Sequence, residues 1–373
     1  MTRPFRIALI ASAVMGLVRI IWVLRFPEID GDAYGHFGIS IYAWDKPQNL
    51  HVHWVWLPLY HFVVGALNAL GLSFRGLRIV NALLAIGTPL LLFDAVKRRL
   101  SEREALAAAL ALAIAPLATV MGTSAQYETA FTFCIVLSVF FTTREKHAAA
   151  GIALAVACFL RYEAWGATLV LCGVWALAKV RKKEAPPFVT LAIPTALIVL
   201  YILFRWWWDK ELLFFFRSTH QFTKEMVARK EWTFREIIHF PLLLPFDALG
   251  PAIFLLPFGI RPALKVSWMI PAGLAGFLLL SYYASASPSG ERYLISLVPF
   301  ACVAIAVGAL RMGQTIGRSR VFAGITIALL LFWTTRHLRI MGSIATAHEA
   351  ELRAREAELA KLSLDPSRPP PGP

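Results

Sequence analysis

The sequence predicts an all-α protein, a polytopic bundle of about eleven transmembrane helices with interfacial helices in its first external loop. The chain of 373 residues is 58% hydrophobic and only 16% charged, with a mean hydropathy of +0.62. Soluble proteins carry nearer a quarter charged residues. Long apolar runs separated by arginine and lysine clusters exclude a soluble core with a single anchor, and the lack of strand-like alternation excludes a membrane barrel.

The formal net charge of +14 comes from basic residues whose positions indicate the membrane topology. They lie mainly in short loops between apolar runs, and such loops are retained on the cytoplasmic side of a membrane. A nucleic-acid partner is therefore not expected. The four cysteines lie inside apolar runs without metal-ligand spacing, so they are interpreted as small buried hydrophobic side chains.

The first predicted span covers residues 7–24. Arg3 and Arg6 precede it and place the N-terminus in the cytoplasm. Since no small-residue cleavage site follows the apolar run, we expect the segment to be a retained helix and not a signal peptide. Residues 25–75 then form the first external loop.

The apolar stretch 54–72 is expected to lie along the membrane interface and not to cross. Pro58 and His61 make it a poor span, whereas Trp56 and Tyr60 suit the level of the lipid headgroups. If this stretch crossed, nearly every later basic loop would lie outside. If it does not cross, all of the basic clusters lie inside: 97–103, 144–146, 179–183, 261–265 and 311–320.

The remaining spans are expected at residues 76–96, 104–121, 127–142, 148–161, 164–180, 187–206, 246–261, 267–284, 292–311 and 320–336. The transmembrane domain thus covers residues 1–345. Residues 346–373 are expected to form a short exposed helix, with charge pairs at the i,i+4 spacing, followed by a disordered Pro-rich tail.

A second long external loop is expected at residues 206–245, where aromatic clusters precede basic side chains. This composition suits a surface that handles a lipid with an anionic head. A plain amphipathic interfacial helix accounts for it equally well.

The external side is expected to collect several charged residues: Asp30, Asp32, Glu128, Arg161, Glu163, Glu291 and Arg292. A carboxylate in the hydrocarbon core costs about 3 kcal/mol, so these groups should face a polar cavity or one another. The acidic stretch 28–36 is either a solvated loop or a functional motif, and Arg161 with Glu163 is either a structural ion pair or part of a site.

Carboxylates beside arginines at an interface suit a reaction on a phosphate-linked lipid. A carboxylate can deprotonate an acceptor hydroxyl, and an arginine can neutralise the departing phosphate. The motifs follow in the order Asp30-Gly31-Asp32-Ala33-Tyr34, Trp54-Val55-Trp56-Leu57-Pro58-Leu59-Tyr60, Ala115-Pro116, Gly122-Thr123-Ser124-Ala125-Gln126-Tyr127-Glu128, Arg161-Tyr162-Glu163 and Gly290-Glu291-Arg292-Tyr293.

This order resembles the glycosyltransferase C (GT-C) superfamily of membrane glycosyltransferases, in particular its mannosyltransferase-like, family 39-like members. The resemblance covers about residues 1–310 and is strongest before residue 165. It implies an inverting transfer from a polyprenyl- or dolichyl-phosphate sugar to a lipid, glycan or protein acceptor. It also implies the roles of the site residues: Asp32 or Asp30 as general base, Glu128 and Glu163 as acceptor-positioning groups, and Arg292, Arg161 and Tyr293 around the donor phosphate.

Two points of this resemblance stay open. Many members have adjacent acids, whereas Gly31 separates Asp30 from Asp32; Asp32 is favoured as the base because it leads directly into Ala33-Tyr34. Some relatives use a divalent metal, and the two aspartates with Glu128 would offer oxygen ligands to Mg or Mn. Many single-sugar members work without a metal, so none is assigned.

Other functional classes make different predictions. A transporter or lipid flippase should carry ionisable groups through the membrane depth and a broken helix near the midplane. A non-catalytic assembly subunit should tolerate loss of Asp32. The gathering of charges at one face favours the enzyme. The compact loops favour a bacterial inner membrane as its location, with the site external.

Overall fold

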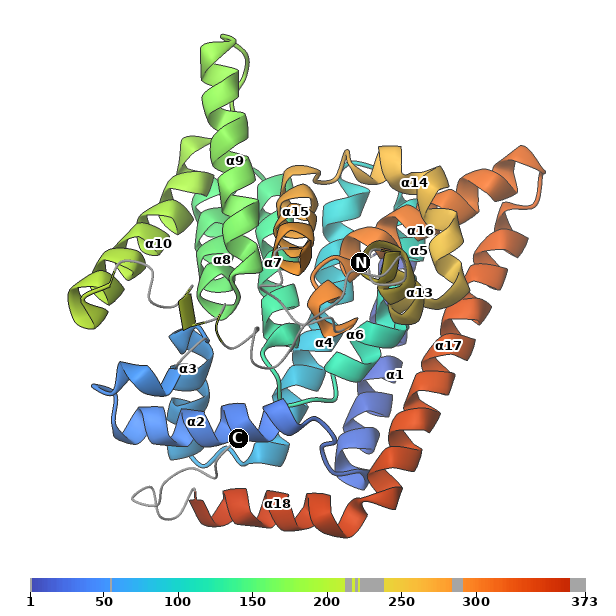
Figure 1. The fold of residues 1–373 in the computed structure, drawn as a ribbon. Helices are drawn as coiled ribbons and strands as arrows, with labels where there is room; N and C mark the ends of the chain where they lie inside the picture. The colour runs from blue at the N-terminus through green and yellow to red at the C-terminus, as the bar shows by residue number, and fades with distance from the viewer. Residues whose placement is uncertain are drawn as a thin grey trace.

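The computed structural model describes residues 2–53, 56–211, 217–218, 221, 238–283 and 291–362. Every regular element in these ranges is a helix, which confirms the predicted all-α class. The long helices stand side by side, and two further helices, α2 (Gly31–Asp45) and α18 (Glu349–Leu362), run across one end of the bundle (Figure 1).

The first half of the bundle contains α1 (Arg3–Arg25), α3 (Pro58–Ala69), α4 (Phe74–Lys97), α5 (Glu102–Ala113), α6 (Pro116–Met121), α7 (Glu128–Thr143), α8 (His147–Leu160), α9 (Glu163–Val180) and α10 (Phe188–Asp209). The second half contains a π-turn (His239–Leu243), α13 (Leu244–Leu249), a 3-10 segment (Gly250–Leu255), α14 (Leu256–Ala263), α15 (Met269–Tyr283), α16 (Val298–Thr315) and α17 (Ser319–Ala347). Short 3-10 turns lie at Leu50–His53 and Glu291–Leu294.

The membrane character of the chain is confirmed, but the count of eleven spans is not. Within the described residues, seven helical segments are long and apolar enough to cross a membrane: α1, α4, α9, α10, Pro241–Ala263, α16 and α17. The apolar helices α7, α8 and α15 are shorter, and the predicted span 104–121 is divided into α5 and α6. Each predicted span nevertheless overlaps a helix of the structure.

Close helix contacts rest on small residues, as expected where lipid offers no hydrophobic drive between helices. Gly166 of α9 faces the backbone of Gly273 in α15, and Gly259 of α14 faces Gly308 in α16. A side chain at any of these glycines would collide with the neighbouring backbone. The same helix pairs, α9 with α15 and α14 with α16, are in extensive contact.

The division between α5 and α6 follows from Pro116, which cannot continue the hydrogen-bond ladder of α5. Arg19 of α1, fully buried, compensates for the break. Its Nη2 donates to the Ala113 carbonyl at 2.9 Å and to Thr119 Oγ1 at 3.2 Å. A charged side chain therefore closes a gap in the backbone bonding of its neighbour.

The first external loop contains more helix than the sequence predicted. The stretch 31–45, read there as part of an acidic loop, forms α2. The Asp30 side chain caps it by accepting from the Asp32 N–H at 3.0 Å. The stretch 54–72 contains a helix, α3, as expected; its place at the membrane interface stays a prediction, and Trp54 lies outside the described residues.

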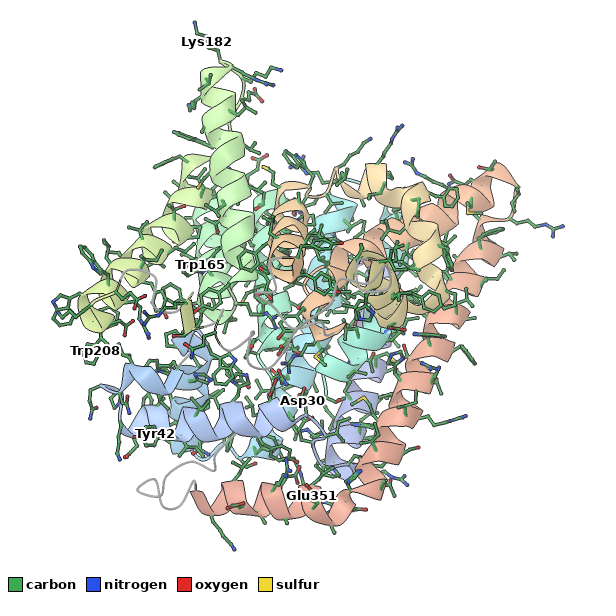
Figure 2. The ribbon with its side chains drawn as sticks, in the orientation of Figure 1. Asp30, Tyr42, Trp165, Lys182, Trp208 and Glu351 are labelled. Atoms are coloured by element: carbon green, nitrogen blue, oxygen red, sulfur yellow. The ribbon has the colours of Figure 1, made fainter. Side chains whose placement is uncertain are left out.

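The predicted basic cluster after α9 and the acidic loop before α2 lie at opposite ends of the molecule (Figure 2). Lys182, in one of the predicted cytoplasmic clusters, is at the tip beyond α9, whereas Asp30, Tyr42 and Glu351 lie at the other end (Figure 2). Which end faces the cytoplasm stays a prediction from the basic loops. Most of the expected external loop 206–245 and the tail 366–373 lie outside the described residues.

The C-terminal helix α18 is exposed at most positions but also has a face that packs against the protein. Its outer face carries the predicted pairs, Glu349 with Arg353 at 2.8 Å and Glu351 with Arg355 at 2.9 Å. Its inner face buries Leu352 and Leu359, and the helix packs on α2 and α4. Glu349, Glu351, Arg353 and Arg355 dominate the sequence of the helix and obscure this second face.

A buried carboxylate, Glu28, fastens the external end of α1 to the rest of the protein. Its Oε1 accepts from the N–H groups of Ile29 and Asp30, at 3.0 and 3.2 Å. Its Oε2 accepts from the Ala125 N–H at 3.0 Å and lies 3.4 Å from Nε of Arg78. Glu28 thus joins the loop between α1 and α2 to the loop between α6 and α7, residues 122–127.

Arg78 completes this anchor from the start of α4. Its Nε donates to the Thr123 carbonyl at 2.8 Å, and its Nη1 donates to the Phe26 carbonyl at 2.9 Å. Glu356 of α18 lies 3.6 Å from Arg78 Nη1, and its Oε1 accepts from the Glu28 N–H at 3.2 Å. α1, both early external loops, α4 and α18 therefore meet at one ion-pair cluster.

Replacing Arg78 with Ala should destabilise the fold by about 3 kcal/mol or more, because the Glu28 carboxylate stays buried without its cation. Arg75→Ala is the matched control. Arg75 pairs with the same Glu356 at 3.2 Å, but its side chain is 42% exposed, against 1% for Arg78. The control should cost about 0.5 kcal/mol. Unfolding in detergent measures both, and equal losses would contradict the assigned role of Arg78.

Candidate active site

In the loop at residues 122–127, the N–H groups of Gly122, Thr123 and Ser124 donate to backbone carbonyls at the end of α6, and neighbouring side chains bind the rest of the loop. Asn81 Nδ2 donates to the carbonyls of Ser124 and Gln126, both at 2.7 Å. The Tyr60 hydroxyl donates to the Ala125 carbonyl. The loop is thereby fixed against α3 and α4, with Gln126 and Tyr127 directed toward the acidic loop.

The two aspartates of the first loop share one arginine. Arg292 Nη2 pairs with Asp32 Oδ2, and Arg292 Nη1 lies 3.6 Å from Asp30 Oδ2. Gln126 Nε2 donates to the same Asp30 oxygen, and Gln126 Oε1 accepts from Arg292 Nη1 at 3.5 Å. The late 3-10 turn at residues 291–294 therefore closes onto both early loops.

The two carboxylates differ in environment. The Asp30 side chain is 26% exposed and is bonded to Gln126 and to the N–H of Asp32, whereas the Asp32 side chain is 50% exposed. Burial, aided by the negative charges of Glu28 and Asp32, raises the pKa of Asp30 to about 6, although Arg292 opposes the shift. Asp30 therefore changes charge close to neutral pH.

A second ion cluster lies buried beside the first. Arg161, at the end of α8, donates through Nη1 to Glu128 Oε1 at 2.6 Å and through Nε to Glu163 Oε1 at 2.9 Å. All three side chains are almost inaccessible to solvent. The other oxygen of Glu128, Oε2, is buried and has no hydrogen-bond partner among the described residues.

Tyr293 joins the two clusters. The Arg161 guanidinium lies 4.9 Å from the centre of the Tyr293 ring, and that of Arg292 lies 5.5 Å from the same ring. Arg161 is also 5.3 Å from the centre of the Tyr127 ring. Aromatic faces attract cations, so these rings keep the two arginines close without neutralising them.

The structure brings together all seven residues that the sequence predicted for the site: Asp30, Asp32, Glu128, Arg161, Glu163, Arg292 and Tyr293. The side chain of Glu291 lies outside the described part. Sequence reasoning missed the linking role of Gln126.

The arrangement does not fit the divalent metal considered from the sequence. Arg292 already supplies positive charge to Asp30 and Asp32, and Arg161 does so for Glu128. No group of three or more His, Cys, Asp or Glu side chains suited to a metal occurs among the described residues.

A model of the family described as dolichyl-phosphate-mannose-protein mannosyltransferase matches residues 46–208, less than half of the chain. The matched region includes Glu128, Arg161 and Glu163 but neither aspartate nor Arg292. Comparison with curated proteins gives no match.

Two solved structures share the fold. The oligosaccharyltransferase of Archaeoglobus fulgidus, in complex with Zn and sulfate, aligns with a TM-score of 0.56 and 11% identity, over 90% of this chain and 53% of its own. ArnT from Cupriavidus metallidurans aligns with a TM-score of 0.55 and 14% identity, over 95% of this chain and 74% of its own.

The chain thus spans about half the length of that oligosaccharyltransferase and about three quarters of ArnT. At such low identity the likeness shows the fold. Together with the matched family region and the order of the site motifs, it confirms the resemblance read from the sequence: this polytopic membrane protein has the GT-C fold.

Proposed function

We propose that the protein is an integral-membrane glycosyltransferase. It transfers a sugar from a polyprenyl-phosphate donor to an acceptor hydroxyl at the external face, with inversion at the anomeric carbon. The observation that carries this proposal is the pairing of Arg292 with Asp32 and Asp30, beside the buried Glu128–Arg161–Glu163 cluster. The cation can neutralise a departing phosphate, and a carboxylate at the same site can take the proton from an attacking hydroxyl.

Asp32 is proposed as the general base. Its carboxylate is the more accessible of the two, and only Arg292 engages it among the described residues. Asp30 caps α2 and accepts from Gln126, so both of its oxygens are already used. We assign Asp30 the task of holding α2 and Arg292 in position.

Arg292 is proposed to hold the donor phosphate. A quarter of its side chain is exposed, and it can exchange Asp32 for a phosphate oxygen without moving far. Arg161, which the sequence also predicted at the phosphate, is buried between two glutamates. Its proposed task is to position those glutamates, with Tyr293 between it and Arg292.

Glu128 is proposed to position the acceptor. Arg161 occupies Oε1, which leaves Oε2 as a buried acceptor for a hydroxyl proton. Such an unmade bond is costly in the absence of a ligand. Glu163 supports Glu128 by sharing and orienting Arg161.

The reaction is a single displacement. The acceptor hydroxyl loses its proton to Asp32, its oxygen forms a bond with the anomeric carbon, and the bond between that carbon and the phosphate oxygen breaks. The electron pair leaves with the polyprenyl phosphate, whose charge Arg292 neutralises. The description of the matched family, a dolichyl-phosphate-mannose-protein mannosyltransferase, supports a lipid-phosphate sugar as donor.

One observation speaks for a transporter or flippase, namely the division between α5 and α6 with a buried arginine beside it. Arg19 is, however, bonded to the Ala113 carbonyl and to Thr119, so it has a structural task at the break. The carboxylates and arginines of the site gather instead in two adjoining clusters around Tyr293, which favours chemistry at one place over a pathway across the membrane.

Replacing Asp32 with Asn should lower the rate of transfer by about 10²- to 10⁴-fold, because it removes the base without changing the shape of the side chain. Asp45→Asn is a matched control on the same helix, at an exposed position, and should leave the rate unchanged. The test follows sugar transfer from a polyprenyl-phosphate donor. Near-normal turnover of the Asp32 variant would remove it as the base.

Arg292→Ala should raise the KM for the donor about 10- to 100-fold, because it removes the binding free energy of one charge-assisted hydrogen bond. Arg355→Ala, an exposed change on α18, is its control. An unchanged KM in the Arg292 variant would place the phosphate elsewhere.

The Arg292→Ala variant also tests the electrostatics of Asp30. Wild-type kcat/KM should rise with pH through about 6, as Asp30 ionises and engages Gln126 and Arg292. Since the Arg292 cation favours the ionised carboxylate, its removal should move this midpoint to higher pH. A midpoint that stays or moves to lower pH would contradict the assigned pairing.

A further inference from the structure

Three cations surround one carboxylate where α4 and α7 end. Asp94 Oδ2 accepts from Arg98 Nε at 3.1 Å and from Arg144 Nε at 3.0 Å. Lys97 Nζ lies 3.3 Å from Asp94 Oδ1. The Asp94 side chain is 11% exposed, whereas the side chains of the cations are 34–41% exposed. Asp94 thus fixes three accessible cations at one place.

The cluster lies at the level of the lipid headgroups. Helix α4 is long and apolar enough to cross a membrane, so charged side chains in its last turn lie where the hydrocarbon core ends. Asp94 is about 24 Å along the axis of α4 from Arg78, by the helical rise. The cluster is therefore separate from the candidate active site, whose early loops Arg78 anchors.

An apolar cavity of about 530 Å³ lies beside these cations. Asp94, Lys97 and Arg144 line it together with four apolar side chains from α1, α4 and α7, namely Phe5, Leu90, Leu91 and Phe140. The Arg144 guanidinium lies 4.3 Å from the centre of the Phe140 ring. The charged side chains and the apolar walls therefore belong to one cavity.

The two arginines keep unused hydrogen-bond donors. Arg98 and Arg144 each use Nε for Asp94, and their terminal nitrogens have no hydrogen-bond partner among the described residues. The terminal nitrogens of a guanidinium can bind two oxygens of one phosphate. Arg144, which lines the cavity, can thus bind a phosphate without releasing Asp94.

The charge balance of the cluster favours an anion. The three cations exceed the charge of Asp94 together with the C-terminal ends of α4 and α7, which add about half a negative charge each. Further acids on the same segments are Glu102, Glu104 and Glu145. Glu102 accepts from Thr2 Oγ1 at 2.6 Å. Five further basic residues on these segments outnumber the acids, at positions 3, 6, 99, 103 and 146.

Helix termination and topology explain only part of this arrangement. Cations in the last turn of a helix suit its dipole, and basic loops set the orientation in the membrane. A link between α4 and α7 needs only the pair of Asp94 with Arg144. None of these roles requires three cations on one carboxylate beside an apolar cavity.

We propose that this cavity binds an anionic phospholipid. Arg144 donates to the headgroup phosphate, Lys97 supplies a second positive charge, and an acyl chain lies between Phe5 and Phe140. A basic pocket between membrane helices suits an anionic lipid head. The cationic group of a zwitterionic lipid would be repelled by the cluster. This site goes beyond the proposed transferase function and does not depend on it.

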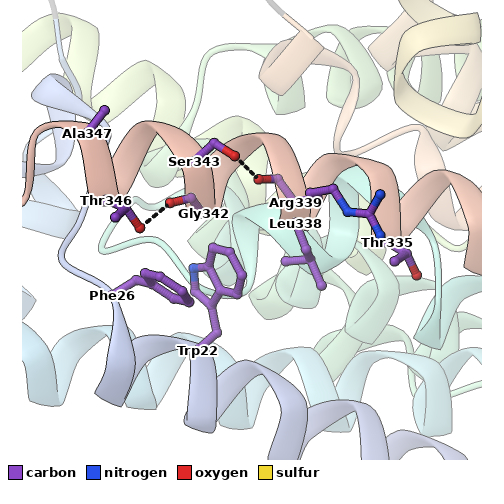
Figure 3. Close-up of a pocket in the computed structure, with 9 residues that line it drawn as sticks. All are labelled: Trp22, Phe26, Thr335, Leu338, Arg339, Gly342, Ser343, Thr346 and Ala347. Atoms are coloured by element: carbon purple, nitrogen blue, oxygen red, sulfur yellow. Dashed lines mark hydrogen bonds between the residues drawn. The ribbon is translucent and has the colours of Figure 1, made fainter.

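A second cavity offers a comparison within the same molecule. It measures about 690 Å³ and lies between α1 and α17, with Trp22 and Phe26 facing Leu338 (Figure 3). Arg339 also lines it, but no ion pair of Arg339 occurs among the described residues. This cavity therefore separates the effect of one cation beside apolar walls from the effect of the Asp94 cluster.

The test measures lipid binding to the purified full-length protein by native mass spectrometry. Phosphatidylglycerol is titrated in parallel with phosphatidylcholine of the same acyl chains, and inorganic phosphate is added as a competitor. We expect phosphatidylglycerol to bind about tenfold more tightly than phosphatidylcholine. Inorganic phosphate should not displace it, because phosphate alone makes no contact with the apolar walls.

Variants test each part of the site. Arg144→Gln should weaken the tightest binding of phosphatidylglycerol about tenfold, and Lys97→Gln about fivefold. Leu91→Trp keeps all three cations but fills the cavity, so it should also weaken binding about tenfold. Arg339→Gln removes one cation from the second cavity and should bind as wild type. Thermal unfolding with and without lipid shows that each variant is folded, and only the lipid-dependent shift is compared.

Equal affinity of wild type for the two lipids would overturn the proposal, as would wild-type affinity in Arg144→Gln or Leu91→Trp. A loss in Arg339→Gln as large as that in Arg144→Gln would overturn it too, because any cation beside an apolar cavity would then suffice. Displacement by inorganic phosphate would identify a site for free phosphate instead. Since none of these measurements involves sugar transfer, failure of the lipid site is distinguishable from failure of the proposed function.

Discussion

The buried Glu28 carboxylate is the constraint on which the end of the bundle with α2 and α18 depends. It accepts from the backbone of both early loops and lies against Arg78, which α18 reaches through Glu356. A charge pair in a buried setting adds little to stability in itself, but the loss of one partner is severe. The pair therefore specifies one arrangement of α1, α2, α4 and α18, and with it the place of the acidic motif.

The site is built from segments that this anchor aligns. Asp30 lies two residues after Glu28 in the sequence. Gln126 directly follows Ala125, whose N–H donates to Glu28. Arg292 arrives from the far end of the sequence and closes on both. Because the Glu128–Arg161–Glu163 cluster is buried and rigidly paired while Arg292 and Asp32 are partly exposed, the exposed pair is free to exchange partners with a substrate.

Much of this could be predicted from composition and charge. Apolar runs predict the long helices, and costly charges at the ends of those runs predict the residues that cluster between them, whereas the orientation read from the basic loops stays a prediction. Helix α2 could not be predicted, because Gly31, Gly35 and Gly38 lower the helix propensity of its sequence. In the folded protein, burial of Phe37 outweighs this low propensity. A neutral partner such as Gln126 acts through contacts distant in sequence, which no local pattern shows.

The most direct measurement follows the fate of a lipid-linked sugar. Purified protein in nanodiscs is incubated with a panel of polyprenyl-phosphate sugars and acceptors, and mass spectrometry detects released polyprenyl phosphate. The account predicts that one donor is consumed, with one lipid phosphate formed for each sugar transferred. Binding of a donor that stays intact, with its passage to the other leaflet in vesicles, would contradict the account and identify a flippase.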